Sequence, residues 1–178
     1  KYDANDLFAL GENYDFKMPR NRRKAVHYYR KAAEQGHPDA QNYLGECLRD
    51  GEGCMKNLRD AVFWFRKAAR KGVPEAQLSL GYSLFYGEGV RRDRKAALEQ
   101  YRKAARAGEP GAMINIGHMH RRGHVLSKDI RKAIRWYERA AEFGYTNAYH
   151  WLGRIFGGHE DYPADHKKAL KWLKLAAA

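Results

Sequence analysis

The chain has 178 residues, 44% of them hydrophobic, and a formal net charge of +13. The apolar content is enough for a continuous core, and no apolar run approaches the roughly 18 residues needed to span a bilayer. The basic balance favours an anionic partner, such as an acidic protein face, a polyanion or an acidic membrane surface.

Short motifs recur along the whole chain with a period of 36 residues. A strict period in this range is typical of stacked repeat proteins, in which each unit packs only on its neighbours. Such a protein offers a surface for holding something, rather than a pocket for chemistry. The recurring motifs are the alanine pairs that begin at Ala32, Ala68, Ala104, Ala140 and Ala176, and the glycines Gly36, Gly72, Gly108 and Gly144.

Residues 38–72 show what one unit contains. Pro38 opens a helix, where its missing N–H has no consequence, and apolar residues follow at helical spacing. The segment from Gly51 to Gly53 breaks this helix, and Asn57 is the expected N-cap of a second one. Gly72 ends the second helix in a left-handed conformation. The unit is therefore predicted to be an antiparallel pair of helices, of about 12 and about 14 residues.

The same features return in the other units. A mid-helix glycine costs about 1 kcal/mol relative to alanine, so glycines in register indicate that the partner helix approaches closely. Repetition of one packing geometry predicts a right-handed superhelix of helix pairs. The recurring residues are the prolines Pro38, Pro74 and Pro110, the caps Asn21, Asn57, Asp93, Asp129 and Asp165, and the mid-helix glycines Gly45, Gly81, Gly117 and Gly153.

These motifs resemble the Sel-1-like repeat (SLR) family, a relative of tetratricopeptide repeats. The resemblance implies an all-α, right-handed α/α superhelical solenoid of five 36-residue helix-turn-helix repeats. The first unit departs from the pattern, with Ala9 where the glycine belongs, Gly11 two places late and Phe16-Lys17-Met18-Pro19 in the loop. We expect one repeat domain over residues 1–178, cut from a longer chain, with repeats at about 3–37, 38–73, 74–109, 110–145 and 146–178. The motif is carried most fully by unit three, in Ala76, Leu80, Gly81, Gly87, Gly89, Val90, Asp93, Lys95, Ala96, Tyr101, Lys103, Ala104, Ala105 and Gly108.

The family resemblance also implies a function, which is to assemble or tether other proteins without catalysis or a cofactor. Both a periplasmic or secreted location and a cytoplasmic one are compatible with it. No nucleophile, base and orienting group form a set in the sequence, and serine and threonine occur at only four positions. The chain is therefore predicted not to be an enzyme.

By similarity to tetratricopeptide geometry, the first helix of each pair lines a concave groove. Aromatic residues and arginine are typical of binding hot spots, and arginine can grip a carboxylate with two hydrogen bonds. We expect a protein or peptide partner with an acidic portion. The alternative is that Tyr82 and Phe85 pack on neighbouring helices and that the arginines are solvated. The expected groove residues are Asn42, Glu46, Arg49, Leu78, Tyr82, Phe85, Tyr86, Ile114, His118, Arg121, Arg122, His150 and Arg154.

The second helices are densely basic, which suggests an alternative function. A polyanion such as nucleic acid could bind there through counterion release. We expect the aromatic residues of these helices to be buried, and therefore unable to stack on single strands, which disfavours nucleic acid as the partner. Much of this charge lies at Arg66, Lys67, Arg70, Lys71, Arg91, Arg92, Arg94, Lys95, Arg102, Lys103, Arg106, Lys128, Arg131, Lys132, Arg135, Arg139, Lys167, Lys168, Lys171 and Lys174.

Two other groups invite a functional interpretation. His118, His120 and His124 lie close in sequence, but the first two point to different sides of one helix, so no metal site is predicted. Cys47 and Cys54 could form a local disulfide or could remain two small buried apolar side chains.

Overall fold

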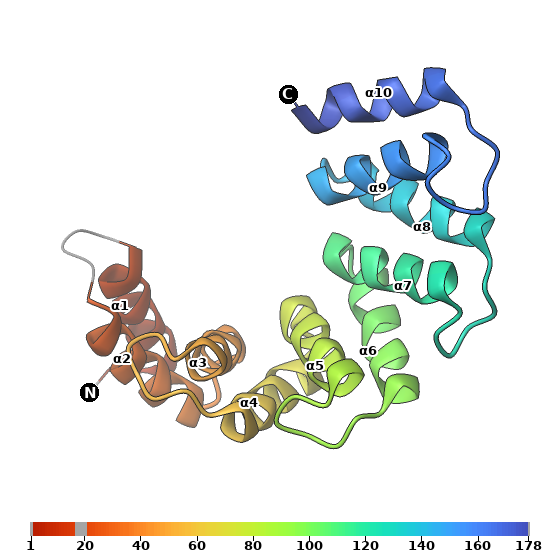
Figure 1. Cartoon of the computed structure of the whole chain (residues 1–178). Helices are drawn as coiled ribbons and strands as arrows, with labels where there is room; N and C mark the ends of the chain where they lie inside the picture. The colour runs from red at the N-terminus through yellow and green to blue at the C-terminus, as the bar shows by residue number, and fades with distance from the viewer. Residues whose placement is uncertain (1, 17–20, 178) are drawn as a thin grey trace. The chain divides into compact units, whose positions relative to one another are not determined.

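The structure is a computed structural model that describes residues 2–16 and 21–177. All regular structure in the described residues is helical, and the helices form five successive pairs (Figure 1). The prediction of an all-α solenoid built from five helix pairs is confirmed. The helices are α1 (Ala4–Phe16), α2 (Arg22–Glu34), α3 (Pro38–Asp50), α4 (Leu58–Arg70), α5 (Pro74–Tyr86), α6 (Arg94–Arg106), α7 (Pro110–Arg122), α8 (Ile130–Glu142), α9 (Thr146–Phe156) and α10 (His166–Ala177).

The chain divides into two compact units, Lys1–Gln100 and Tyr101–Ala178, and the division falls within α6. In the first unit α1 packs on α2, α2 on α3, α3 on α4, and α4 on α5. In the second unit α7 packs on α8, α8 on α9, and α9 on α10. Contacts between consecutive helices thus dominate each unit, as in a repeat protein whose units bury their apolar faces against their neighbours.

The helix ends follow from the side chains that the sequence places there. Each predicted N-cap oxygen accepts a hydrogen bond from the backbone N–H three residues later, which satisfies a donor that has no partner within the helix. Gly72 follows the end of α4 with φ +90°, a conformation that side-chain-bearing residues rarely adopt. The cap bonds are Asn21 to Lys24 (3.1 Å), Asn57 to Asp60 (3.2 Å), Asp93 to Ala96 (3.0 Å), Asp129 to Lys132 (2.9 Å) and Asp165 to Lys168 (3.0 Å).

Three of the mid-helix glycines, Gly45, Gly117 and Gly153, lie against a large side chain of the second helix, as predicted. A Cβ placed on Gly45 would be 2.6 Å from Cε1 of Phe65. A Cβ on Gly117 would be 2.4 Å from Cε1 of Tyr137. Neither ring could remain in place if the glycine carried a side chain, because carbon atoms in contact stay about 3.5–4.0 Å apart.

The first pair follows a shifted register, which corrects the assignment of Ala9 to the glycine position. Ala9 is exposed, and Gly11 is the residue on which a Cβ would lie 2.4 Å from Cδ1 of Tyr29. Gly11 therefore has the role that Gly45 has in the second pair. Five residues separate α1 from α2, whereas seven separate α3 from α4. Phe16, expected in the loop, is the last residue of α1, and Lys17-Met18-Pro19 lie outside the described residues.

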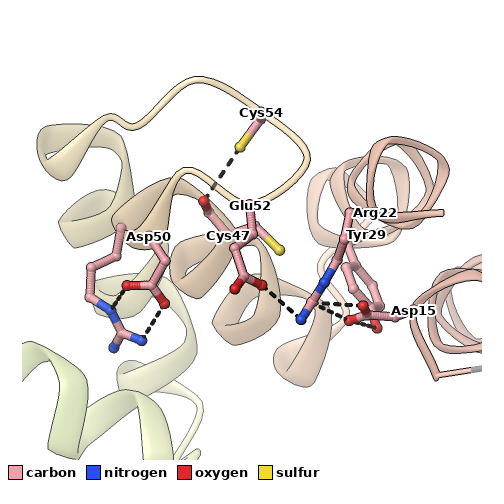
Figure 2. A network of polar contacts seen from close by, with 8 residues as sticks. Asp15, Arg22, Tyr29, Cys47, Asp50, Glu52 and Cys54 are labelled. Carbon is pink, nitrogen blue, oxygen red and sulfur yellow. Dashed lines mark hydrogen bonds and ion pairs between the residues drawn. The ribbon is translucent and has the colours of Figure 1, made fainter. Parts of the chain in front are cut away.

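A charge network centred on the buried Asp15 connects the first helix pair to the second. Asp15 near the end of α1 is only 1% exposed and forms an ion pair with Arg22 at 2.7 Å. The Tyr29 hydroxyl donates to the same carboxylate at 3.3 Å, and Arg22 also binds Glu52 at 2.7 Å (Figure 2). A buried carboxylate is tolerated when it is paired and hydrogen-bonded in this way.

The two cysteines are not joined. Figure 2 shows the Cys54 thiol directed at the backbone carbonyl of Cys47, 3.5 Å away. Burial raises the pKa of the Cys47 thiol to about 12. A thiol with that pKa stays protonated at neutral pH, so Cys47 behaves as a small apolar side chain.

Candidate partner-binding faces

The most exposed aromatic pair on a first helix lies on α5. Tyr82 is 41% exposed and Tyr86 is 55% exposed, with ring centroids 4.5 Å apart. Phe85 is half-buried beneath the Arg94 guanidinium, which is 4.9 Å from the centre of the ring. Leu78 is also half-buried. Of the expected groove residues on α5, Tyr82 and Tyr86 therefore present surface, whereas Phe85 packs against its neighbours.

A hollow of about 310 Å³ lies on the first helices of the first unit. Asn42 and Glu46 of the expected groove help to line it, although Asn42 is only 5% exposed. Arg49, on the same helix, instead forms a two-bond ion pair with Asp50, at 2.8 Å for each bond. The full lining is Phe8, Glu12, Asp39, Asn42, Tyr43, Glu46, Val73 and Glu75.

Six of the eight lining residues were not among the expected groove residues, and two of these six, Phe8 and Glu12, lie on the first pair, to which no groove residue was assigned. With Gly11 as the contact glycine, Phe8 and Glu12 occupy the positions of Asn42 and Glu46 relative to Gly45. The signal was present in the sequence, but it was hidden by the two-residue shift.

The hollow is acidic, although the chain as a whole is strongly basic. Burial raises the pKa of Tyr43, and the nearby carboxylates of Glu12, Glu46, Asp39 and Glu75 raise it further. Burial also raises the pKa of Glu46, against the lowering effect of Arg49 and of a hydrogen bond from Asn42. An acidic partner segment would be repelled here, so the expectation of an acidic partner does not fit this part of the molecule.

The second unit presents a basic face. Arg122, His150 and Arg154 are exposed, and the Arg154 guanidinium lies 5.3 Å from the centre of the Trp151 ring. Ile114 was expected to line the groove, but it is only 6% exposed and packs in the core.

Arg121 is not solvated and is not available for a partner's carboxylate. Its Nη1 atom lies 2.6 Å from Oε1 of Glu160, and its side chain is 11% exposed. Its guanidinium also lies 4.6 Å from the centre of the Trp151 ring. The carboxylate that Arg121 binds is thus supplied by the connection between α9 and α10 of this chain.

His118 is held inside this cluster. Its Nδ1 atom lies 2.8 Å from the Tyr137 hydroxyl, and its ring centroid is 4.7 Å from that of Trp151. Burial, together with Arg121 and Arg122, lowers the pKa of His118 to about 4. The imidazole is therefore neutral at pH 7, and its Nδ1 atom shares a hydrogen bond with the hydroxyl of Tyr137, whose own pKa burial raises.

The described residues do not form a metal centre. Among residues 2–16 and 21–177, no three histidine, cysteine, aspartate or glutamate side chains are placed to hold an ion. His120 is half-buried on α7, and burial is the main cause of its lowered pKa.

Across residues 2–16 and 21–177, no helix combines the length and apolarity that a membrane crossing requires.

The second helices expose most of their lysines and arginines, and the aromatic side chain of Phe63 with them. Phe63 is 51% exposed, and Lys67 lies 4.6 Å from the centres of both the Phe63 and the Trp64 rings. The expectation that aromatic residues of these helices are buried is correct for Trp64, at 7% exposed, and wrong for Phe63.

Comparison with known proteins gives consistent matches over the whole chain. A family model described as the Sel1 repeat matches five times in succession, at residues 5–37, 38–73, 74–109, 110–145 and 146–178. A Sel1 repeat protein from Oxalobacter formigenes is 34% identical, with a TM-score of 0.91, and the match covers 98% of this chain and 70% of that protein's structure. No curated protein sequence is significantly similar.

Two further solved structures extend the comparison. A protective antigen present in uropathogenic Escherichia coli strains, which displays an SLR fold, is 30% identical with a TM-score of 0.86. That match covers 98% of this chain but only 38% of the antigen's structure. An immunity protein from Pseudomonas aeruginosa, at 20% identity and a TM-score of 0.53 over 98% of this chain and 81% of its own, shares the fold.

Proposed function

This chain belongs to the Sel1 repeat family, and from that premise we propose that it is a non-enzymatic scaffold that binds a partner protein or peptide on the outward faces of its first helices. The observation that carries the proposal is the exposed pair Tyr82 and Tyr86. Large aromatic side chains that remain in water next to a binding face are typical anchors of protein interfaces.

The exposed basic residues of the second unit support the proposal that the partner has an acidic portion. Arg122 and Arg154 are exposed, and His150 lies on the same helix as Arg154. Arginine binds carboxylates with two parallel hydrogen bonds, which gives both affinity and orientation. The acidic segment of the partner is therefore assigned to this unit.

The arrangement of reactive groups supports a role without catalysis. The Ser83 hydroxyl donates to the Ser79 carbonyl at 3.0 Å, and both serines are buried. The neutral His118 is engaged by Tyr137. A catalytic set needs a nucleophile within reach of a base and of substrate, and neither serine meets that requirement.

The test compares two matched double variants. Tyr82→Ala/Tyr86→Ala removes the exposed aromatic pair, whereas Arg66→Ala/Arg70→Ala removes two exposed charges from the outer face of α4. Phe85 and Arg121 are left intact because they support the fold through Arg94 and Glu160. Each protein is immobilised, and material captured from extract of the source cells, with and without nuclease treatment, is identified by mass spectrometry.

A protein captured by the parent and by Arg66→Ala/Arg70→Ala, and lost from Tyr82→Ala/Tyr86→Ala, is the expected result. If capture depends on the α4 arginines and disappears after nuclease treatment, the outer basic helices bind a polyanion and the proposal fails. A steep loss of binding with salt would accompany that outcome.

A further inference from the structure

The hollow on the first unit is built by three successive helix pairs. Phe8 and Glu12 come from α1, Asp39, Asn42, Tyr43 and Glu46 from α3, and Val73 and Glu75 from the start of α5. Its volume, about 310 Å³, is that of a site for a side chain rather than for a folded element.

Four carboxylates face this space. Within the described part of the chain, none of Glu12, Asp39, Glu46 and Glu75 forms an ion pair with a lysine, arginine or histidine. Asp39 and Glu75 lie in first turns, where a negative charge also favours the helix dipole. Glu12 and Glu46 lie in the second halves of their helices, where the dipole does not favour them. Their position therefore needs another explanation.

The side chain of Asn42 also indicates a ligand, independently of the carboxylates. Its side chain lines the hollow and is 5% exposed, and its Oδ1 atom is buried with no hydrogen-bond partner. Its Nδ2 atom donates to Oε1 of Glu46 at 3.2 Å, which fixes the orientation of the amide. A buried acceptor without a donor is unfavourable, and an N–H group of a ligand would satisfy it if binding in the hollow opened the wall enough to expose this oxygen.

The aromatic residues of the wall favour a planar cation. The rings of Phe8 and Tyr43 lie 5.7 Å apart, at 41° to each other. A guanidinium stacks on such rings and offers five N–H donors to surrounding carboxylates, whereas an ammonium is a compact, strongly hydrated charge.

We infer that the hollow lined by Glu12, Asn42, Tyr43 and Glu46 binds an arginine side chain of the partner protein. This inference rests on the proposed function, because it names a residue type of the partner that the scaffold binds. It also gives the first unit a charge preference opposite to that of the second unit's basic face. The partner's segment would therefore carry a basic residue here in addition to its acidic portion.

The test uses three short peptides that differ in one central residue, which is arginine, lysine or citrulline. Citrulline keeps the shape of arginine without its charge. Binding to the whole chain is measured by calorimetry, and the parent is mapped by NMR through the Asn42 side-chain amide and the Tyr43 ring. The site variant is Glu12→Gln/Glu46→Gln, and the control is Glu34→Gln/Glu99→Gln, which alters two exposed glutamates of the same unit.

The arginine peptide is expected to shift the Asn42 and Tyr43 signals and to bind the site variant roughly tenfold more weakly than the parent or the control. The citrulline peptide is expected not to bind. Equal binding of arginine and citrulline peptides, or equal losses in the two variants, would overturn the inference. A lysine peptide that binds as tightly as the arginine peptide would contradict the guanidinium assignment.

The NMR mapping on the parent keeps the test valid if the site variant does not fold. The outcomes also separate this inference from the proposed function. Capture of a partner that needs Tyr82 and Tyr86, with no arginine peptide bound in the hollow, leaves the scaffold function intact and rejects the arginine site. Loss of tyrosine-dependent capture rejects the scaffold function, whatever the peptide does.

Discussion

The glycine in the middle of a first helix determines how closely the second helix can approach. Gly45, Gly117 and Gly153 each lie where a Cβ would collide with Phe65, Tyr137 and Leu173, respectively. The ring or leucine fills the space that a side chain would have taken. A residue type that is unfavourable in an isolated helix is therefore favourable in the packed pair.

Replacing Gly45 by alanine separates this packing role from helix propensity. If propensity alone mattered, Gly45→Ala would stabilise the protein by about 1 kcal/mol. Because the new Cβ would lie 2.6 Å from the Phe65 ring, we expect destabilisation by about 1–3 kcal/mol in urea unfolding. Phe65→Leu should remove much of the penalty when it is combined with Gly45→Ala. A single variant more stable than the parent would show that the contact is not limiting.

His118 makes the free energy of unfolding depend on pH, because its imidazole has different pKa values in the folded and the unfolded chain. The pKa of its imidazole is about 4 in the folded protein, against an ordinary value of 6.5. Between pH 6.5 and 4 the unfolded chain binds more protons than the folded one, so stability falls as the pH falls through this range. After allowance for partial exposure, we expect a loss on the order of 1–2 kcal/mol.

The measurement is urea unfolding at pH 7 and at pH 4.5. His118→Gln should show a smaller loss between these pH values than the parent, whereas His27→Gln, at an exposed position, should match the parent. An unchanged loss in His118→Gln would assign the pH dependence to other groups.

At the scale of the helix, the caps and connections decide where each element begins and ends. Five Asn or Asp side chains open the second helices, and glycine closes several of them in the left-handed conformation. These contacts span only a few residues, so their geometry repeats whenever the sequence repeats.

The cap of α8 provides a direct test. Asp129→Ala removes the acceptor for the Lys132 N–H, now 2.9 Å away, and should lower the free energy of unfolding. Asp161→Ala is the control, because its ion pair with Lys128 is exposed and should contribute little to stability. Equal effects of the two changes on thermal unfolding would mean that the cap has no special role.

Local contacts explain why so much of the fold follows from the sequence, and why parts of the binding faces do not. The caps, the prolines and the contact between Gly45 and Phe65 lie within one repeat, where a period of 36 residues suffices to place them. The pairing of Arg121 with Glu160 joins residues 39 apart, through a connection that departs from the repeat, so no periodic argument finds it.

The acidic hollow illustrates a different limit. Its residues come from three helix pairs, and the first pair is offset by two residues from the others. The repeat pattern could identify each first helix, but it could not place Glu12 beside Glu46 without the corrected register. The exposed Phe63 was missed for a related reason, since helical spacing alone does not distinguish a rim position from a core position.

At the scale of the whole molecule, the net charge of +13 conceals surfaces of opposite character. One unit contains a hollow with four carboxylates, and the other presents Arg122 and Arg154. A partner segment that binds the first unit would be selected for a basic residue, and one that binds the second unit for an acidic portion, rather than either by net charge alone. A purely polyanionic ligand would instead select the outer helices.

The most direct test of the scaffold account is a hydrogen-exchange footprint of the chain with its captured partner. Slower exchange is expected in α3, α5, α7 or α9, whose outward faces carry the proposed contacts, with little change in α4, α8 and α10. Protection confined to α4, α8 and α10, together with steep salt dependence, would contradict the scaffold function and assign binding to the outer basic helices.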